Sequence, residues 1–248
     1  DGDTYLGQRI ERREIEIVGS INTRDRDRVF RLRRELNRVL NPQFAATLTY
    51  EYGDYRRVID CRVDNAPVFT RNTIFRDCTV QLACLHPFWR KEFQTRDDIA
   101  VWLGAFEFPE PDGLEIVPSA TSWEVGYRQP SIIVNVFNDG DVKTGLKAEF
   151  RALGMTSNPV LLNIDTQEFI KINLDMVAGD VLTVNTGYGQ KKVELLHDGV
   201  ITDAYRYLDP DSTYLQLDAG DNLFRYDADS SLENLEVSIY HDDLFLGV

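Results

Sequence analysis

Apolar and polar residues alternate along most of this chain, in short runs that are typical of half-buried β-strands. In the first third, two such runs flank Gly53-Asp54, a pair that favours a tight turn with positive φ at the glycine. These two runs therefore predict a β-hairpin. The strands expected in the first third are 13–21, 47–52, 55–63 and 74–85.

One segment of the first third has a helical period instead. Between residues 25 and 40, apolar side chains recur at steps of three and four, which predicts an amphipathic helix. Asn22 or Thr23 is expected to cap its start, and Asn41-Pro42 to end it. The apolar stripe must pack on the neighbouring strands. It consists of Val29, Leu32, Leu36, Val39 and Leu40.

Beyond Pro130 the pattern is one short strand after another, separated by Gly-, Asn- and Asp-rich turns, without a helix of useful length. Evenly spaced short strands are typical of an antiparallel sandwich or jelly roll. The strands expected are 131–137, 145–152, 159–163, 169–175, 181–185, 191–196, 213–217, 223–228 and 235–240.

The chain is thus expected to be mainly β, with an N-terminal α+β domain at 1–98, a connector at 99–130 and a C-terminal β-sandwich at 131–248. The N-terminal domain and the rest of the chain differ in net charge. Residues 1–98 hold 18 basic and 16 acidic residues, a net charge of +2, whereas the rest holds 9 and 25, a net charge of −16. Such an acidic half argues against a nucleic-acid partner.

Arginines crowd the helical segment of the first half, interleaved with Asp25, Asp27 and Glu35. Three readings remain open: a solvated face with mixed ion pairs, a protein interface whose guanidinium groups bind a partner's carboxylates, or a phosphate site. The candidate subunit-interface residues are Arg24, Arg28, Arg31, Arg34 and Arg38.

Three cysteines, Cys61, Cys78 and Cys84, lack the C-x-x-C spacing of metal or redox motifs. We interpret them as buried reduced thiols, as in a protein assembled in a reducing cytoplasm; a catalytic or metal-binding role is the alternative. No apolar run approaches the roughly 18 residues of a membrane-spanning helix, and no membrane partner is expected.

Motifs of catalysis are missing from the sequence: no nucleophile elbow, phosphate loop or zinc motif is present. We therefore predict no catalytic residue, no cofactor and no metal ion. Loop carboxylates such as Asp209 and Asp211 are better explained by turn formation than by calcium. Aromatic residues gather in the connector, where they form either packing contacts or a sugar-stacking surface. They are Trp102, Phe106, Phe108, Trp123 and Tyr127.

Several short motifs, in this order, resemble one family: the distal tail proteins of long, non-contractile-tailed (siphovirus-type) bacteriophages and prophages. None is diagnostic alone, but they extend over nearly the whole chain. The motifs are Asp1-Gly2, Arg12-Arg13-Glu14-Ile15, Cys84-Leu85-His86-Pro87-Phe88-Trp89, Phe106-Glu107-Phe108-Pro109, Asn138-Asp139-Gly140-Asp141-Val142, Asn158-Pro159 with Asn163, Thr166-Gln167-Glu168, Ala178-Gly179-Asp180, Asn185-Thr186, Gly220-Asp221-Asn222 and the closing Tyr240 to Val248. His86 departs from the pattern, since the family usually has an aspartate there.

The resemblance implies a ring-forming N-terminal domain and a C-terminal sandwich related in shape to galectins. It implies a homohexameric ring in the virion tail tip that joins the tail-tube protein to tail-associated or receptor-binding proteins. Family members carry a stretch before the Asp-Gly landmark, so we expect the first sheet to lack its first strands here. The alternative function is a carbohydrate-binding protein that recognises host surface glycans.

Overall fold

The computed structural model describes residues 10–23, 25–70, 76–104, 126–130 and 133–248. It divides into two compact units, which are considered separately. Unit 1 consists of residues 1–92 and 244–248, and unit 2 of residues 93–243. The part of the chain that is described contains no helix long and apolar enough to cross a membrane.

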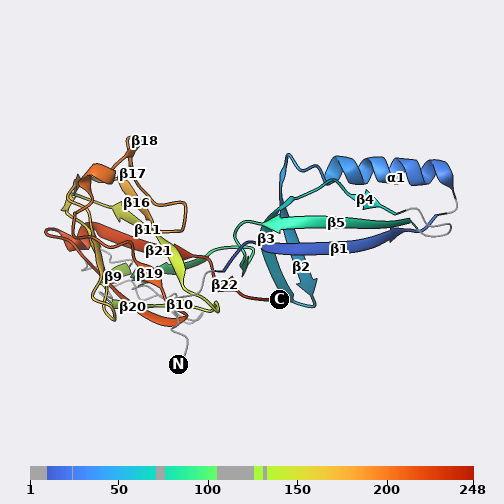
Figure 1. Cartoon of the computed structure of the whole chain (residues 1–248). Coiled ribbons are helices and arrows are strands. Elements are labelled where there is room, and N and C mark those ends of the chain that lie inside the picture. Colours follow the sequence, from blue (N-terminus) through green and yellow to red (C-terminus); the bar gives the residue numbers. More distant parts are fainter. Residues whose placement is uncertain (1–9, 24, 71–75, 105–125, 131–132) are drawn as a thin grey trace, which may run out of the picture. The chain divides into compact units, whose positions relative to one another are not determined.

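Unit 1 is a curved antiparallel sheet with one helix, α1 (Arg26–Val39), along one face (Figure 1). Strand β5 pairs with β1 along nine residues and with β3 and β4 on its other side. Strand β3 also forms the predicted hairpin with β2, and Gly53 in its turn has the expected positive φ of 59°. The strands are β1 (Arg13–Ile21), β2 (Ala45–Tyr52), β3 (Tyr55–Val63), β4 (Val68–Phe69), β5 (Arg76–Cys84), β6 (Trp89–Arg90) and β22 (Leu244–Phe245).

Helix α1 begins one residue after its cap, Asp25, whose carboxylate accepts a hydrogen bond of 2.9 Å from the Asp27 amide. The prediction that Asn22 or Thr23 caps the helix was therefore wrong. Asp25 is the N-cap because it directly precedes the first helical residue, where its side chain reaches the free amides of the first turn. Only Val29 of the apolar stripe is fully buried, and Val39 is 76 % exposed.

Unit 2 is a β-sandwich, as the alternation predicts. One sheet has the order β18-β17-β16-β11-β21-β7, with β19 beside β11, and the other has the order β10-β20-β13-β14. Two further pairs, β12 with β15 and β8 with β9, complete it. The strands of the larger sheet are β7 (Thr95–Asp98), β11 (Thr144–Ala152), β16 (Val181–Asn185), β17 (Lys192–His197), β18 (Val200–Asp203), β19 (Gln216–Leu217) and β21 (Leu235–His241).

The smaller sheet and the two pairs contain β10 (Ile133–Asn138), β13 (Val160–Asn163), β14 (Phe169–Lys171), β20 (Gly220–Asp227), β12 (Thr156–Ser157), β15 (Asp175–Met176), β8 (Ala100–Gly104) and β9 (Gly126–Pro130). Two 3-10 turns, η1 (Tyr205–Tyr207) and η2 (Leu232–Asn234), are also present. The inward residues of both sheets, among them Phe150 and Phe224, form one continuous core, which holds the sheets together.

The two units differ from the expected domains 1–98, 99–130 and 131–248. Strand β7 belongs to unit 2, because it pairs with β21. The connector contributes β8 and β9, which pair with each other. The chain then returns to unit 1 through β22, where Phe245 faces Trp89 of β6 and both side chains are buried. Unit 2 is therefore inserted between two parts of unit 1.

Two buried asparagines from separate family motifs meet in unit 2. The Asn222 side chain donates to the carbonyl oxygens of Asp218 and Gly220, at 2.9 Å each, and accepts from the Asp218 amide at 2.9 Å. The Asn138 amide donates to the same Asp218 carbonyl at 3.3 Å. These bonds satisfy backbone groups where the chain turns between β19 and β20 and thereby hold β10 beside that turn.

Candidate interaction site

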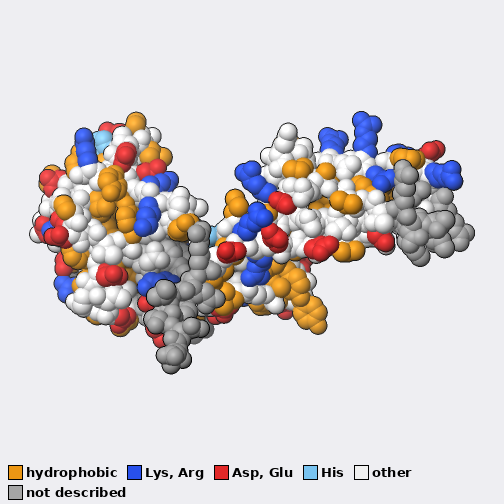
Figure 2. All heavy atoms as spheres, in the orientation of Figure 1, with side chains coloured by type: hydrophobic (Ala, Val, Ile, Leu, Met, Phe, Trp, Pro, Cys, Tyr) orange, Lys and Arg blue, Asp and Glu red, His pale blue; other side chains and the backbone are white. Residues whose placement is uncertain are grey.

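Four of the candidate interface arginines form a stripe on the outer face of α1. Arg28, Arg31, Arg34 and Arg38 follow each other at steps of three and four, so they share one helix face, and all are exposed. Lys and Arg side chains stand out along this side of unit 1 (Figure 2). The fifth candidate, Arg24, lies outside the described residues.

The stripe has no ion-pair partner within the described part of the chain, although Glu35 lies among the arginines. Arg31, Arg34, Glu35 and Arg38 line an open hollow of about 510 Å³. Guanidinium groups whose donors are not used inside the protein are suited to bind a partner's carboxylates in a fork geometry. Whether this face is a protein interface stays a prediction.

Arg33 behaves differently from its neighbours. Its guanidinium carbon lies 4.3 Å from the centre of the Phe69 ring of β4, in a cation–π contact, and the residue is half-buried. From the sequence alone, Arg33 belongs with the other arginines of the segment. Helical spacing alone cannot assign it otherwise, because the contact depends on a strand that lies 36 positions further along the chain.

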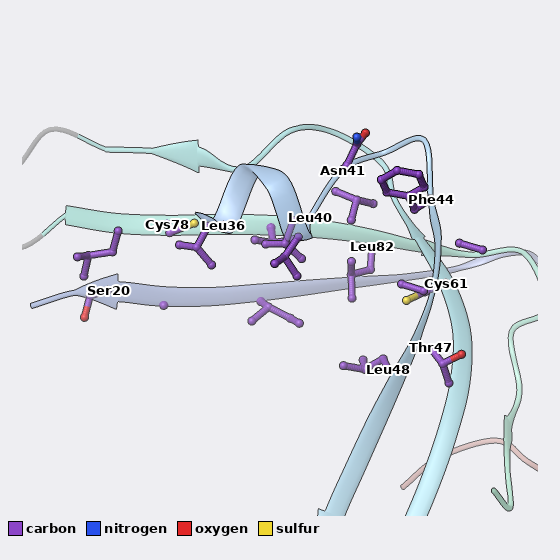
Figure 3. A pocket seen from close by; sticks show the side chains of 18 residues that line it. Ser20, Leu36, Leu40, Asn41, Phe44, Thr47, Leu48, Cys61, Cys78 and Leu82 are labelled. Atoms are coloured by element: carbon purple, nitrogen blue, oxygen red, sulfur yellow. The ribbon is translucent and has the colours of Figure 1, made fainter. Parts of the chain in front are cut away.

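A second feature of unit 1, which the sequence did not predict, is an apolar groove of about 560 Å³ beside the end of α1 (Figure 3). Strand β1 contributes Ile17 to it and β2 contributes Leu48, while Cys61 and Val80 come from β3 and β5. Val39 of α1, which is exposed, also lines the groove, so its apolar side chain forms part of this apolar surface.

Strands β1 and β2 each have an unpaired edge in the described part of unit 1. Strand β1 pairs only with β5, and β2 pairs only with β3. An unpaired edge presents a row of amides and carbonyls to which a strand of another chain can add. The two edges belong to different strands, β1 and β2.

The connector aromatics are only partly placed. Phe106, Phe108 and Trp123 lie outside the described residues. The backbones of Trp102 in β8 and Tyr127 in β9 occupy neighbouring positions, since Trp102 pairs with Arg128 and Leu103 pairs with Tyr127. Whether these residues form a sugar-stacking surface stays a prediction.

The Asp209 side chain stabilises the turn in which it lies. One Asp209 carboxylate oxygen accepts from the Asp211 amide at 3.0 Å, and the other accepts from the Asn173 side chain at 3.1 Å. The Asn173 bond, with help from the Asp211 amide, lowers the pKa of Asp209. Across the described ranges, no group of three His, Cys, Asp or Glu residues is arranged to hold a metal ion.

His197 is the histidine with the clearest electrostatic partner. Its Nδ1 lies 2.7 Å from a carboxylate oxygen of the buried Asp180, whose other oxygen accepts from the Val177 amide at 3.0 Å. The hydrogen bond and the negative charge of Asp180 raise the pKa of His197 above 6.5. Protonation of His197 is therefore more favourable in the folded protein than in the unfolded chain.

Changing Asp180 to asparagine is expected to lower the pKa of His197 back toward its ordinary value, which NMR titration of the imidazole can measure. Because the folded pKa is raised, this pair stabilises unit 2 fully below pH 6.5, and the stabilisation is lost as the pH rises through the raised value. Asp211→Asn is the control, since it removes an exposed carboxylate that does not pair with His197. An unchanged His197 titration in Asp180→Asn would contradict the assignment.

Sequence comparison with protein families matches both parts of the chain. Residues 139–242 match the C-terminal domain of the siphovirus-type tail component, and residues 1–84 match the phage tail protein RIFT-related domain. The chain belongs to the distal tail protein family of siphovirus-type phages. The resemblance seen in its motifs is thereby confirmed, and both halves are tail-protein domains. No curated protein sequence matches it.

Solved structures share the fold of this tail protein. The Dit protein (gp 19.1) of phage SPP1, described as a paradigm of the hub adsorption apparatus in phages that infect Gram-positive bacteria, superposes with a TM-score of 0.67. It is 14 % identical, and the match covers 96 % of this chain and 81 % of that one. A chain of the phage P2 baseplate is 11 % identical with a TM-score of 0.51, over 95 % and 80 % of the two chains. Neither these structures nor the family domains are described as carbohydrate-binding or enzymatic.

Proposed function

We propose that this tail protein is a structural hub, in which several copies close into a ring between the tail tube and the tail tip. The observation that carries the proposal is that, within the described part of unit 1, β1 and β2 each have an unpaired edge. A ring requires a heterologous contact, in which one surface of each copy meets a different surface of the next. Two distinct edges are compatible with this type of contact.

The arginine stripe on α1 supplies the second part of the proposed interface. Arg28, Arg31 and Arg34 are exposed and lack acidic partners within the described part of the protein, so carboxylates of a neighbouring copy can bind them. We place the ring contacts in unit 1. The acidic unit 2 then faces tail-associated or receptor-binding proteins, and the tail-tube protein binds the ring's other face.

We propose that the ring has six copies. We further propose that it assembles in the bacterial cytoplasm before it is incorporated into the virion tail tip. Light scattering after size exclusion, with negative-stain images of the same peak, tests the copy number. Six chains of 28.5 kDa give about 170 kDa and ring-shaped particles. A monodisperse dimer with two-fold symmetry would overturn the ring, because its contact joins identical surfaces.

Reversing the charge of Arg28, Arg31 and Arg34 to glutamate is expected to shift the assembled species to monomer at physiological salt. The reason is that three guanidinium groups are replaced by carboxylates, which repel the acidic partner groups. Size-exclusion light scattering measures the change in mass. We expect the variant to fold, because these three side chains are exposed.

The matched control reverses three exposed arginines of unit 2, namely Arg151, Arg206 and Arg225. The change in net charge is the same, so a general charge effect would disrupt both variants. Assembly that is lost only in the α1 variant supports the stripe as an interface. Assembly that survives in the α1 variant removes the stripe from the ring contacts.

A further inference from the structure

Two of the three cysteines face each other across neighbouring strands of unit 1. The antiparallel register of β3 and β5 pairs Arg62 with Ala83 and Val63 with Leu82. One step further along the same ladder, Cys61 of β3 comes opposite Cys84 of β5. Both cysteines point into the core, because Val63 and Leu82, two positions away on their strands, are buried on the same face as they are.

The type of pair that they form follows from one hydrogen bond. The amide of Asp64 donates to the carbonyl of Gln81 at 2.9 Å, which marks these residues as a hydrogen-bonded pair of the ladder. Hydrogen-bonded and non-hydrogen-bonded pairs alternate, so three steps further the cysteines occupy a non-hydrogen-bonded pair. The Cα atoms of such a pair are about 4.5 Å apart, within the range of about 4.4 to 6.8 Å that disulfides span.

The surroundings of the two thiols are consistent with this proximity. Burial raises the pKa of Cys84 first, and the neighbouring Cys61 raises it further. Burial likewise raises the pKa of Cys61. Both thiols are therefore protonated and slow to react at neutral pH, and they are free in this structure.

The apolar groove gives one member of the pair a route to small molecules. Cys61 lines the groove, and its side chain is visible on the wall (Figure 3). Cys84 is fully buried and is not part of the lining. A reagent that enters the groove can reach Cys61 but not Cys84, and Cys84 is the cysteine opposite Cys61 on the neighbouring strand.

We propose that Cys61 and Cys84 are a latent disulfide pair, which a small-molecule disulfide such as oxidised glutathione converts to an intrachain bond. The Cys61 thiolate attacks one sulfur of the reagent, forming a mixed disulfide and releasing one small thiol. The Cys84 thiolate then attacks the Cys61 sulfur and releases the second. Overall, two protein thiols and one small disulfide become one protein disulfide and two small thiols.

The bond would form where strand β3 changes its pairing partner. Next to Cys61, strand β3 changes partners: Arg62 and Val63 pair with β5, whereas Val58 pairs with Arg90 of β6. A bond between Cys61 and Cys84 would tie β3 to β5 where their ladder ends. The thiols would stay reduced in a cytoplasm and form the disulfide outside it. Unit 1 of the same chain would then have a higher thermal stability outside the cell than inside it.

The test uses the full chain, incubated with and without oxidised glutathione at pH 8, then denatured and alkylated. We expect the treated protein to weigh two hydrogens less than the untreated protein before alkylation. After alkylation it should carry one alkyl group, on Cys78, and yield one peptide linked through Cys61 and Cys84. The thermal midpoint of unit 1 is expected to rise by roughly 10 °C on oxidation. Alkylation of both Cys61 and Cys84 after treatment would overturn the proposal, as would glutathione that stays on Cys61 or any linkage to Cys78.

Cys78 provides the matched control, because it is a buried cysteine that also lines the groove but faces Gly19 of β1 and Phe69 of β4. Cys78→Ala should therefore leave the mass loss and the midpoint shift unchanged. Cys84→Ala should abolish both and leave the mixed disulfide on Cys61. A midpoint shift that persists in Cys84→Ala would assign the effect to another modification.

Discussion

Replacing Phe150 with alanine is expected to lower the free energy of unfolding of unit 2 by about 4 kcal/mol. Phe150 is fully buried on β11, with β16 and β21 on either side, and it belongs to the core shared by the two sheets. Truncation removes the apolar contacts and leaves a cavity between layers that cannot close completely. Urea unfolding followed by circular dichroism, with separate transitions fitted for the two units, measures the change.

The control for this substitution is Phe137→Ala, on β10 of the same unit. Phe137 is 53 % exposed, so its truncation removes much less buried surface. We expect a loss below about 1 kcal/mol. Equal losses for the two phenylalanines would mean that the sandwich core is not where unit 2 gains its stability.

Replacing Asn222 with alanine is expected to lower the free energy of unfolding of unit 2 by about 3 kcal/mol. The change removes four side-chain hydrogen bonds at once, one from the Asp218 amide and three to the carbonyls of Val136, Asp218 and Gly220, at buried or partly buried places. Buried backbone groups that lose their partners cost more than the bonds themselves contribute. The same urea experiment measures the loss.

Asn173→Ala is the matched control, since Asn173 is exposed and its side chain donates to Asp209 from the surface. Water can replace this bond, so the expected loss is below about 1 kcal/mol. A loss for Asn222→Ala as small as that for Asn173→Ala would show that the turn between β19 and β20 does not depend on its asparagine.

Much of the fold could be predicted because its strongest signals are local. The alternation over Arg13–Ile21 predicted β1 with the bounds that it has in the structure. The turn at Gly53 has the positive φ that joins β2 to β3, and helix α1 lies within the predicted 25–40. A repeating pattern or a special turn residue needs no knowledge of distant partners.

Strands that depend on distant partners were not predicted. Strand β22 has two residues and β7 has the polar sequence Thr95–Asp98, so neither shows a period. Each exists because of a partner far away in sequence: Leu244 pairs with Arg90, and Asp98 pairs with Ser238. For this reason the expected domain boundaries did not include the return of the chain to unit 1.

The candidate site shows the same division. Helical spacing was enough to place Arg28, Arg31 and Arg34 on one face, but no spacing could predict that Arg33 stacks on Phe69. The groove is lined by residues from α1 and four strands, so it exists only in three dimensions. The prediction from the sequence was that the cysteines are buried thiols. That Cys61 lies opposite Cys84 depends on the register between β3 and β5, which the sequence does not specify.

The insertion of unit 2 within unit 1 sets an order of completion during protein synthesis. Every strand of the sandwich lies before Leu244 in the sequence, whereas unit 1 is complete only when β22 pairs with β6. A chain that terminates before Leu244 can carry a finished sandwich, yet it lacks Phe245 over the buried end of the sheet in unit 1. If unit 1 forms the ring, a chain that ends before β22 is expected to assemble poorly, because its ring-forming unit lacks a strand and a core side chain.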